Sequence, residues 1–177
     1  AVAQNLSTEA RSGRQAVRNA NDGISVIQTA EAATKEVMGI LDRLRELAVQ
    51  SSSETLATTE RGYINTEATA LEDEIQRIAE VTEFNGIKLG DGTLASVAVQ
   101  VGVTAATSSR ISISLASLTT GSGLGISAIS LNTASDARSA ITTLDTAMNS
   151  VNNARATYGA TQNRLDSAVS NMSNYVE

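Results

Sequence analysis

Cysteine, histidine, proline and tryptophan are all absent from the 177-residue sequence. Without cysteine the chain can form no disulfide and has no thiol chemistry. Without histidine as well, the usual zinc and copper ligands, the usual general bases and the Cys–His and Ser–His nucleophile pairs are missing. A GxxxxGK[ST] loop for phosphate binding is absent too. We therefore expect a protein that is not an enzyme and has no cofactor and no metal.

Aromatic residues are scarce, with only three tyrosines and one phenylalanine, while alanine, serine and threonine are abundant. Small side chains let helices approach closely, and the scarcity of aromatics removes the bulky groups that fill the centre of a round core. The composition therefore favours long, thin helix packing. We expect a single elongated domain over residues 1–177.

The formal net charge of −6 and the pI near 4.7 argue against nucleic acid as a partner, because that binding rests on clustered Lys and Arg. No apolar run approaches the roughly 20 residues that a membrane-spanning helix needs. The polar start "AVAQNLSTEA" also lacks the basic segment and apolar core of a classical signal peptide. We expect neither nucleic-acid binding nor membrane insertion.

Heptad-like spacing of apolar residues predicts three helices, at about 4–52, 56–80 and 135–176. In the first of these, two adjacent apolar stripes form an arc wide enough to pack against two neighbours at once. Asp22-Gly23 would ordinarily indicate a turn, but the stripes keep their phase across it, so we expect one continuous helix. This helix should end near "SSSET", whose Ser and Thr side chains can cap the next helix.

Strand and turn signals mark the region from about 84 to 131. Asn85-Gly86 and Asp91-Gly92 suit tight turns, and valines alternate with smaller residues from Val97 to Val103. The same alternation returns at Ile111–Leu115 after the loop "TAATSS", and the Gly/Ser-rich loop 119–127 should lead to one more short extended piece. Because an isolated hairpin is only marginally stable, we expect these strands to pack against the helices.

These patterns together predict a mainly α fold with a small β region. We expect an elongated antiparallel helical bundle or coiled coil, made of two N-terminal helices and a C-terminal helix, with β-hairpins at one end. The first residue is not Met, and the last apolar stripe has not ended at residue 177. We therefore expect a fragment of a longer helical protein.

The stretch "LDRLRELAVQ" at residues 41–50 is the candidate binding segment. On a helical projection Leu47 falls at the margin of the apolar arc, and Arg43 and Gln50 lie just beyond it. A leucine at an exposed edge beside an arginine suits a binding anchor. Periodicity alone, however, favours a plain boundary leucine with a solvated arginine. Carboxylates that recur every seven residues at Glu60, Glu67 and Glu74 favour a solvated helix face over a cation site.

Four stretches, in order and in register, resemble bacterial flagellins. They are "RNANDGISVIQTAEAA" at 18–33, "LRELAVQSSS" at 44–53, "FNGIKL" at 84–89 and "ARATYGATQNRLDSAVSNM" at 154–172. The resemblance covers nearly the whole chain and is weakest at 90–135. It implies the rod-like core domain of a filament subunit, without the terminal helical segments that form the innermost tube of flagellar filaments.

The resemblance implies a secreted, extracellular protein of the bacterial flagellum that packs with other flagellin subunits for swimming motility. Because the terminal segments of the family are absent, we expect this fragment itself to be monomeric. The alternatives are a hook-filament junction protein, which shares the "NANDGIS" type of stretch, and a free-standing coiled-coil scaffold. "LRELAVQ" followed by "FNGIKL" favours flagellin over the first, and the hairpin region has no obvious use in the second.

The resemblance also changes the interpretation of residues 41–50. In flagellins recognised by Toll-like receptor 5, the matching arginine and leucine form the main receptor contact with a glutamate on the next helix. Counting back from "FNGIKL" places that glutamate at Glu67. The implied receptor-binding residues are therefore Arg43, Leu47, Gln50 and Glu67. The same surface would be covered in a filament, so recognition should require released monomer.

Overall fold

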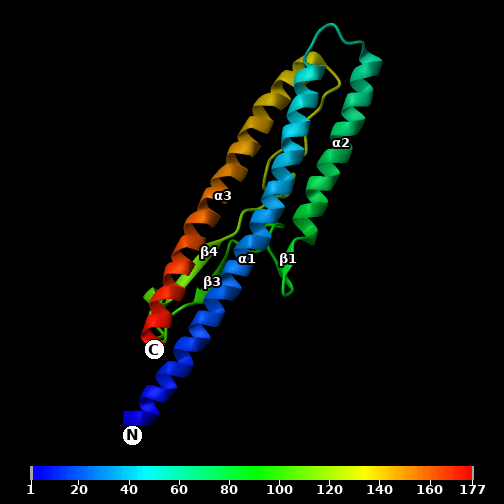
Figure 1. The fold of residues 1–177 in the computed structure, drawn as a ribbon. Coiled ribbons are helices and arrows are strands. Elements are labelled where there is room, and N and C mark those ends of the chain that lie inside the picture. The colour runs from blue at the N-terminus through cyan, green and yellow to red at the C-terminus, as the bar shows by residue number, and fades with distance from the viewer. Residues whose placement is uncertain (1, 177) are drawn as a thin grey trace.

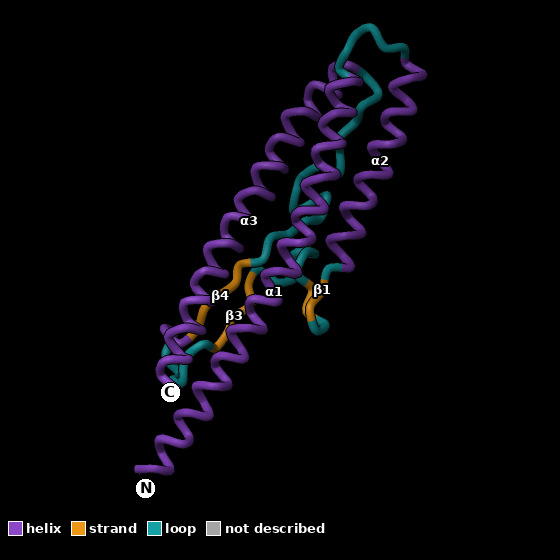
Figure 2. Tube along the Cα trace, viewed as in Figure 1, coloured by secondary structure: helices purple, strands orange, loops and turns teal. Residues whose placement is uncertain are grey.

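The computed structural model describes residues 2–176, with side chains for residue 4 and residues 7–176, and forms an elongated rod (Figure 1). Helix α1 spans Val2–Ser51, α2 spans Thr58–Val81 and α3 spans Ala134–Val176. Figure 2 shows α1 flanked by α2 and α3 in the upper half of the rod, with the strands lower down. The fold class expected from the sequence, a mainly α elongated bundle with a small β region, is confirmed.

Two short antiparallel hairpins make up the β region. β1 (Glu83–Phe84) pairs with β2 (Ile87–Lys88), and β3 (Ser96–Gln100) pairs with β4 (Arg110–Ser114). In the first hairpin Asn85 and Gly86 both have positive φ, at 49° and 78°, as the Asn-Gly signal predicts. The second hairpin places Val97 opposite Ile113. The hairpins confirm the Asn85-Gly86 turn and the two alternating strands, but β3 ends at Gln100 and leaves out Val101 and Val103 of the predicted strand.

The prediction of one more short extended piece after the Gly/Ser loop is wrong, because the structure has no strand between residue 127 and the start of α3. This segment instead runs along the helices and buries Leu124, Ile126 and Leu131. Part of its backbone is hydrogen-bonded within its own turns, as from the Ile126 N–H to the Thr120 carbonyl oxygen at 2.7 Å, and two amides donate to side chains of α2. The Leu131 N–H donates to Asn65 Oδ1 on α2 at 2.7 Å, and the Thr120 N–H donates to Gln76 Oε1 at 3.0 Å.

Two apolar clusters lie end to end along the rod, and α1 belongs to both. The upper cluster joins Leu41, Leu44 and Leu47 of α1 to Ile75 of α2 and Leu144 of α3. In the lower cluster, the second hairpin takes the place that α2 has in the upper one. This cluster is built from residues of α1, β3, β4 and α3 that include Ile27, Val99, Ile113, Tyr158 and Leu165. The two stripes of α1 are therefore both buried, as their width predicts.

Gly23 lies inside α1, which runs unbroken through the Asp22-Gly23 pair. A Cβ at this position would lie 3.0 Å from Cγ2 of Val99 and 3.3 Å from Cδ1 of Leu165. Glycine therefore lets β3 and α3 close tightly on α1. The contact explains why a residue that costs about 1 kcal/mol in a helix interior occurs here.

The capping predicted for "SSSET" is wrong. Helix α2 begins at Thr58 with Ala57 as its N-cap residue, and no side chain from the serines or threonines caps it. The Ala57 N–H donates instead to Oε2 of Glu60 at 3.0 Å, which is the carboxylate half of a capping box. The serines are used elsewhere, because Ser51 is buried and its Oγ donates to the Leu131 carbonyl oxygen at 2.6 Å.

Leu144→Ala tests the phase assigned to the helices. Leu144 is fully buried in the upper cluster, so truncation should lower the free energy of unfolding by about 2–5 kcal/mol. The matched control is Leu94→Ala, whose side chain is 44% exposed, with an expected change within about 0.5 kcal/mol. Urea denaturation followed by circular dichroism measures both. Equal effects of the two variants would show that the helix faces are wrongly assigned.

Glu72 of α2 gives the stability of the rod a dependence on pH. Burial, and to a smaller extent the charge of Asp73, raises the pKa of Glu72 from 4.5 to about 7. Between these two values the folded chain holds a proton that the unfolded chain releases. Because the folded chain binds this extra proton, the free energy of unfolding falls as pH rises between these two values.

We expect Glu72→Gln to raise the melting temperature relative to the parent chain at about pH 8, and to change it little at about pH 4. The control is Glu36→Gln, which removes an exposed carboxylate of α1. Thermal unfolding at both pH values measures the difference. An equal shift at the two pH values would contradict a raised pKa.

Candidate functional site

Arg43 and Glu67, two of the predicted receptor-binding residues, meet on the surface between α1 and α2. Arg43 Nε donates to Glu67 Oε1 at 2.9 Å, and its Nη1 donates to Glu46 Oε2 at 3.0 Å. Arg43 thus bridges a carboxylate of its own helix and one of α2. The structure brings together two residues that are 24 positions apart in the sequence.

The electrostatics of this cluster orient Arg43 more than they stabilise the fold. Its hydrogen bonds to Glu46 and then to Glu67 raise the pKa of Arg43, so the guanidinium stays charged. The side chains of Arg43, Glu46 and Glu67 are 48%, 69% and 46% exposed. Solvent screens such pairs, so their contribution to stability is small. The bridge holds the guanidinium and two carboxylates together on one exposed patch.

Leu47 does not take part in this surface, which corrects the sequence-based expectation. The side chain was expected at the exposed edge of the apolar arc, yet it is only 1% exposed and belongs to the upper cluster. The physical reason is that α2 packs beside α1 and extends the buried arc past the margin set by α1 alone. Gln50 is exposed, as predicted. Arg43, Gln50 and Glu67 therefore remain as accessible candidates.

Two further exposed residues near this surface were not singled out from the sequence. Val49 is 47% exposed and lines a shallow hollow with Gln50 and Arg45. Tyr63 is 72% exposed on α2. The signal that identifies Tyr63 is the carboxylate stripe itself, because Tyr63 falls between Glu60 and Glu67 at helical spacing.

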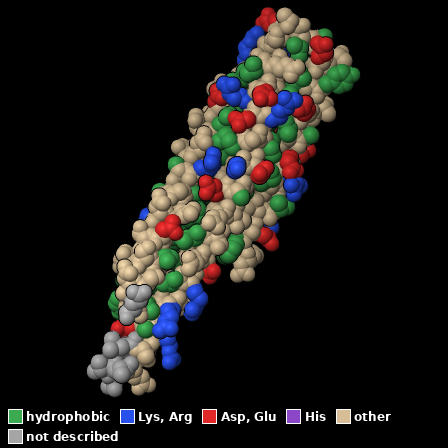
Figure 3. All heavy atoms as spheres, in the orientation of Figure 1, with side chains coloured by type: hydrophobic (Ala, Val, Ile, Leu, Met, Phe, Trp, Pro, Cys, Tyr) green, Lys and Arg blue, Asp and Glu red, His purple; other side chains and the backbone are tan. Residues whose placement is uncertain are grey.

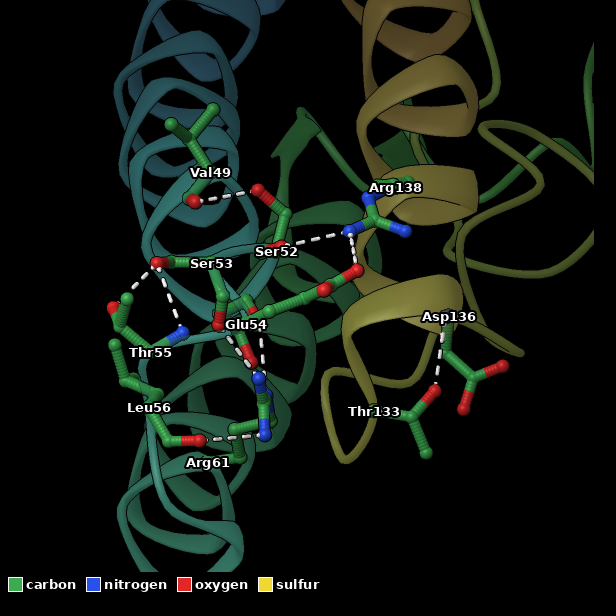
Figure 4. A network of polar contacts seen from close by, with 11 residues as sticks. Val49, Ser52, Ser53, Glu54, Thr55, Leu56, Arg61, Thr133, Asp136 and Arg138 are labelled. Carbon is green, nitrogen blue, oxygen red and sulfur yellow. Dashed lines mark hydrogen bonds and ion pairs between the residues drawn. The ribbon is translucent and has the colours of Figure 1, made fainter.

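The α1–α2 turn, drawn in Figure 4, is organised by Arg61. This arginine is only 9% exposed and donates to three backbone carbonyl oxygens, at 3.0 Å to Ser51, 2.6 Å to Ser53 and 2.9 Å to Leu56. The Ser51 carbonyl belongs to the last residue of α1, and a cation at this end of the helix also interacts favourably with the helix dipole. Arg61 thus fixes the position from which α2 starts.

Arg138 of α3 ties the same turn to the third helix. Its Nη2 donates to Glu54 Oε1 at 2.7 Å, next to the Arg61 contacts in Figure 4. Arg45 makes a similar link lower on α1, where Nε donates to Asp145 Oδ1 of α3 at 2.6 Å. Polar contacts on both sides of α1 therefore set the register of its neighbours, and with it the meeting of Arg43 and Glu67.

Within the part of the chain that the structure describes, no group of three or more Asp and Glu side chains is arranged to hold a metal ion. In the same residues, no helix combines the length and the apolar character that crossing a membrane requires.

Sequence models match both ends of the chain. The model of the bacterial flagellin N-terminal helical region matches residues 1–95, and that of the bacterial flagellin C-terminal helical region matches residues 141–177. The chain belongs to the bacterial flagellin family. Among its relatives, a flagellin of Halalkalibacterium halodurans is 38% identical over 177 residues, which is all of this chain and 65% of that protein. Flagellin B of Vibrio cholerae is 46% identical over 101 residues, which is 57% of this chain and 27% of that protein.

Solved structures agree with this assignment. The flagellin of Bacillus cereus superposes with a TM-score of 0.76 at 32% identity and covers 88% of both chains. A flagellar hook-associated protein from Vibrio parahaemolyticus superposes with a TM-score of 0.79 over 97% of this chain and 90% of that one, at 17% identity. At that identity the second likeness shows the shared fold alone. Family membership therefore rests on the flagellin matches.

The role given to Arg61 is tested by Arg61→Met, which keeps much of the side-chain volume but removes the hydrogen-bond donors. Three carbonyl oxygens of this flagellin turn then lose a charged donor, so we expect a loss of about 2–4 kcal/mol in unfolding free energy. Arg77→Met is the control, because Arg77 is exposed and pairs only within α2, with Glu74. Denaturation curves that coincide for the two variants would contradict the role of Arg61.

Proposed function

We propose that this flagellin chain is a structural subunit of the bacterial flagellar filament, an extracellular polymer that serves swimming motility. The chain spans 65% of the length of the H. halodurans flagellin and 27% of the V. cholerae flagellin B. Its assembly with other subunits, its secretion and its place in the flagellum are therefore proposals. The observation that carries them is the match of both flagellin helical regions to one continuous rod.

The packing of the rod supports a structural role without catalysis. The apolar stripes of α1 are satisfied within the chain, by α2, α3 and the second hairpin. What remains outside is a charged helical surface, which suits contacts between copies. We propose that the 177-residue chain is monomeric by itself, because the apolar stripes of its helices pack against one another in the part of the chain that the structure describes.

The alternatives are weaker for specific reasons. A flagellar hook-associated protein shares the fold, but the sequence relatives described above, at 38% and 46% identity, are flagellins. A free-standing coiled-coil scaffold would not need the second hairpin, whereas here Ile113 of β4 is fully buried in the lower cluster. The hairpin is therefore a structural part of the rod.

We further propose that the surface formed by Arg43, Gln50 and Glu67 binds the Toll-like receptor 5 ectodomain when the subunit is free. The supporting observation is the bridge from Arg43 to Glu46 and Glu67, which holds the guanidinium and two carboxylates on one exposed patch. Arginines in such patches often carry much of the energy of an interface. Leu47 is not included, because its side chain is buried.

Electron microscopy of the protein at its natural length, after salt-induced assembly, tests the filament proposal. We expect long, uniform filaments, and the 177-residue chain alone should sediment as a monomer under the same conditions. Short caps or amorphous aggregates in place of filaments would favour a junction protein or a scaffold. Spontaneous filaments from the 177-residue chain would contradict the proposed monomer.

Receptor binding is tested by titration calorimetry of the chain with the receptor ectodomain. Arg43→Ala and Glu67→Ala should each weaken binding by about fivefold or more, because each removes part of the bridged charge pattern. Arg77→Ala is the matched control, since it breaks a similar exposed ion pair elsewhere on α2. No binding by the parent chain, or equal affinities for all variants, would refute this site.

A further inference from the structure

A hollow of about 630 Å³ lies at the lower end of the rod, between the second hairpin and α3. Its apolar lining comes from Val101, Ile111 and Ala168. Two arginines, Arg110 at the start of β4 and Arg164 on α3, line it as well. The remaining lining residues are all neutral and polar: Thr107, Ser108, Asn163, Ser167 and Asn171. An apolar lining with arginines and amides around it is the composition of a macromolecular docking surface.

The two arginines of the hollow have their charges uncompensated within the described part of the chain. Neither forms an ion pair there, whereas Arg43, Arg45, Arg77 and Arg138 all do. Arg110 makes one long hydrogen bond, from Nη2 to the Ala105 carbonyl oxygen at 3.4 Å. No carboxylate lines the hollow. The hollow therefore suits a partner that carries acidic groups.

The outward face of α2 has the complementary character. Helix α2 contains six carboxylates and two arginines, one of them the buried Arg61, which gives the helix a net charge of −4. Its outward residues recur in alternating steps of three and four, and we call this set the α2 outer stripe. The set consists of Glu60, Tyr63, Glu67, Ala70, Glu74, Arg77 and Val81.

The apolar members of the stripe match the apolar lining of the hollow. Tyr63 is 72% exposed and Val81 is 52% exposed, which is unusual in a chain with so few large apolar groups at its surface. The stripe therefore offers an aromatic anchor between carboxylates. The hollow offers two arginines around a small apolar floor, because Val101 and Ile111 are only 8% and 7% exposed. Tyrosine and arginine are the residues that most often dominate interface energy.

We propose that the α2 outer stripe of a second copy of this chain docks into the hollow between the second hairpin and α3. The inference rests on the proposed filament function and names the surfaces that subunits use on each other. Charge complementarity favours a second copy as the partner, because the arginines of the hollow would face the carboxylates of the stripe. The mode is that of a helix lying in a groove, with side chains at helical spacing as anchors.

The positions of the two surfaces on the rod determine the kind of assembly that such a contact forms. Figure 1 shows α2 along the upper half of the rod and the second hairpin at the lower end, so the stripe cannot reach the hollow of its own molecule. The contact joins two different patches and is heterologous. A heterologous contact repeats from copy to copy without closing on itself when its rotation does not close a ring. Each copy is then displaced along the rod relative to the next.

The surrounding charge supports the same arrangement. On the face drawn in Figure 3, acidic and basic side chains are mixed over the upper and middle parts of the rod, and Lys or Arg side chains also stand out near the lower end. Arg11, Arg14 and Arg18 lie on this lower part of α1. These arginines add positive charge to the lower part of the rod, which favours the approach of an acidic helix face. Glu67 belongs to the stripe and to the candidate receptor surface, so docking covers both.

Site-directed crosslinking tests the contact, and the absence of cysteine makes each engineered thiol unique. Ser167→Cys places a thiol in the hollow, Ala70→Cys places one on the α2 outer stripe, and Ser150→Cys is the control on an exposed part of α3. Variants are mixed in pairs with a short bismaleimide at low salt. The 167–70 pair should crosslink about tenfold faster than the 167–150 pair. Equal rates would overturn the proposal.

Charge reversal in the same assay separates a specific contact from general attraction. Arg110→Glu with Arg164→Glu on the Ser167→Cys partner should lower the crosslinking rate about tenfold, and so should Glu67→Lys with Glu74→Lys on the Ala70→Cys partner. Combining the two reversed partners should restore the rate. A further loss in the combination would overturn the proposal, and circular dichroism verifies that each variant is folded.

The outcome can be separated from that of the filament proposal. Filaments from the protein at its natural length without a preferred 167–70 crosslink would leave the filament function standing and overturn this contact. A preferred and charge-dependent crosslink without filaments would support the contact and contradict the filament function.

Discussion

The burial of α1 on two sides is the constraint on which the rest of this flagellin structure depends. Its upper half packs against α2 and α3, and its lower half packs against the second hairpin and α3. Gly23 permits the closest of these approaches, because a side chain there would meet Val99 and Leu165. Hydrophobic burial along α1 therefore determines where each neighbour lies, and it leaves the outward face of α2 as the main surface without an internal partner.

Polar contacts then determine how the neighbours are aligned rather than whether they pack. Arg61 fixes the start of α2 through three carbonyl oxygens, and Arg45 and Arg138 link α1 and its turn to α3. With α2 held in this register, Glu67 comes within hydrogen-bond distance of Arg43. The candidate receptor surface is thus a consequence of the turn and of the core beneath it. The α2 outer stripe owes its exposure to the same alignment.

The amphipathic stripes could be predicted from the sequence because helical periodicity reports the faces of a single helix directly. The same periodicity could not show how far α2 reaches over α1, which is why Leu47 was expected at an edge and is buried. It also could not reveal Arg61, because a buried arginine bound to backbone carbonyls depends on the path of the turn. Glu67 could be placed only through the family resemblance, since no local pattern links it to Arg43.

Hydrogen exchange of the backbone amides of the free chain tests the central role of α1 most directly. We expect the slowest exchange at residues 26–48 of α1 and 137–165 of α3, which supply the buried residues of the two clusters, and faster exchange in α2, which packs on one side only. Slower exchange in α2 than in these parts of α1, or exchange of α1 at the rate of the loop 119–127, would contradict the account.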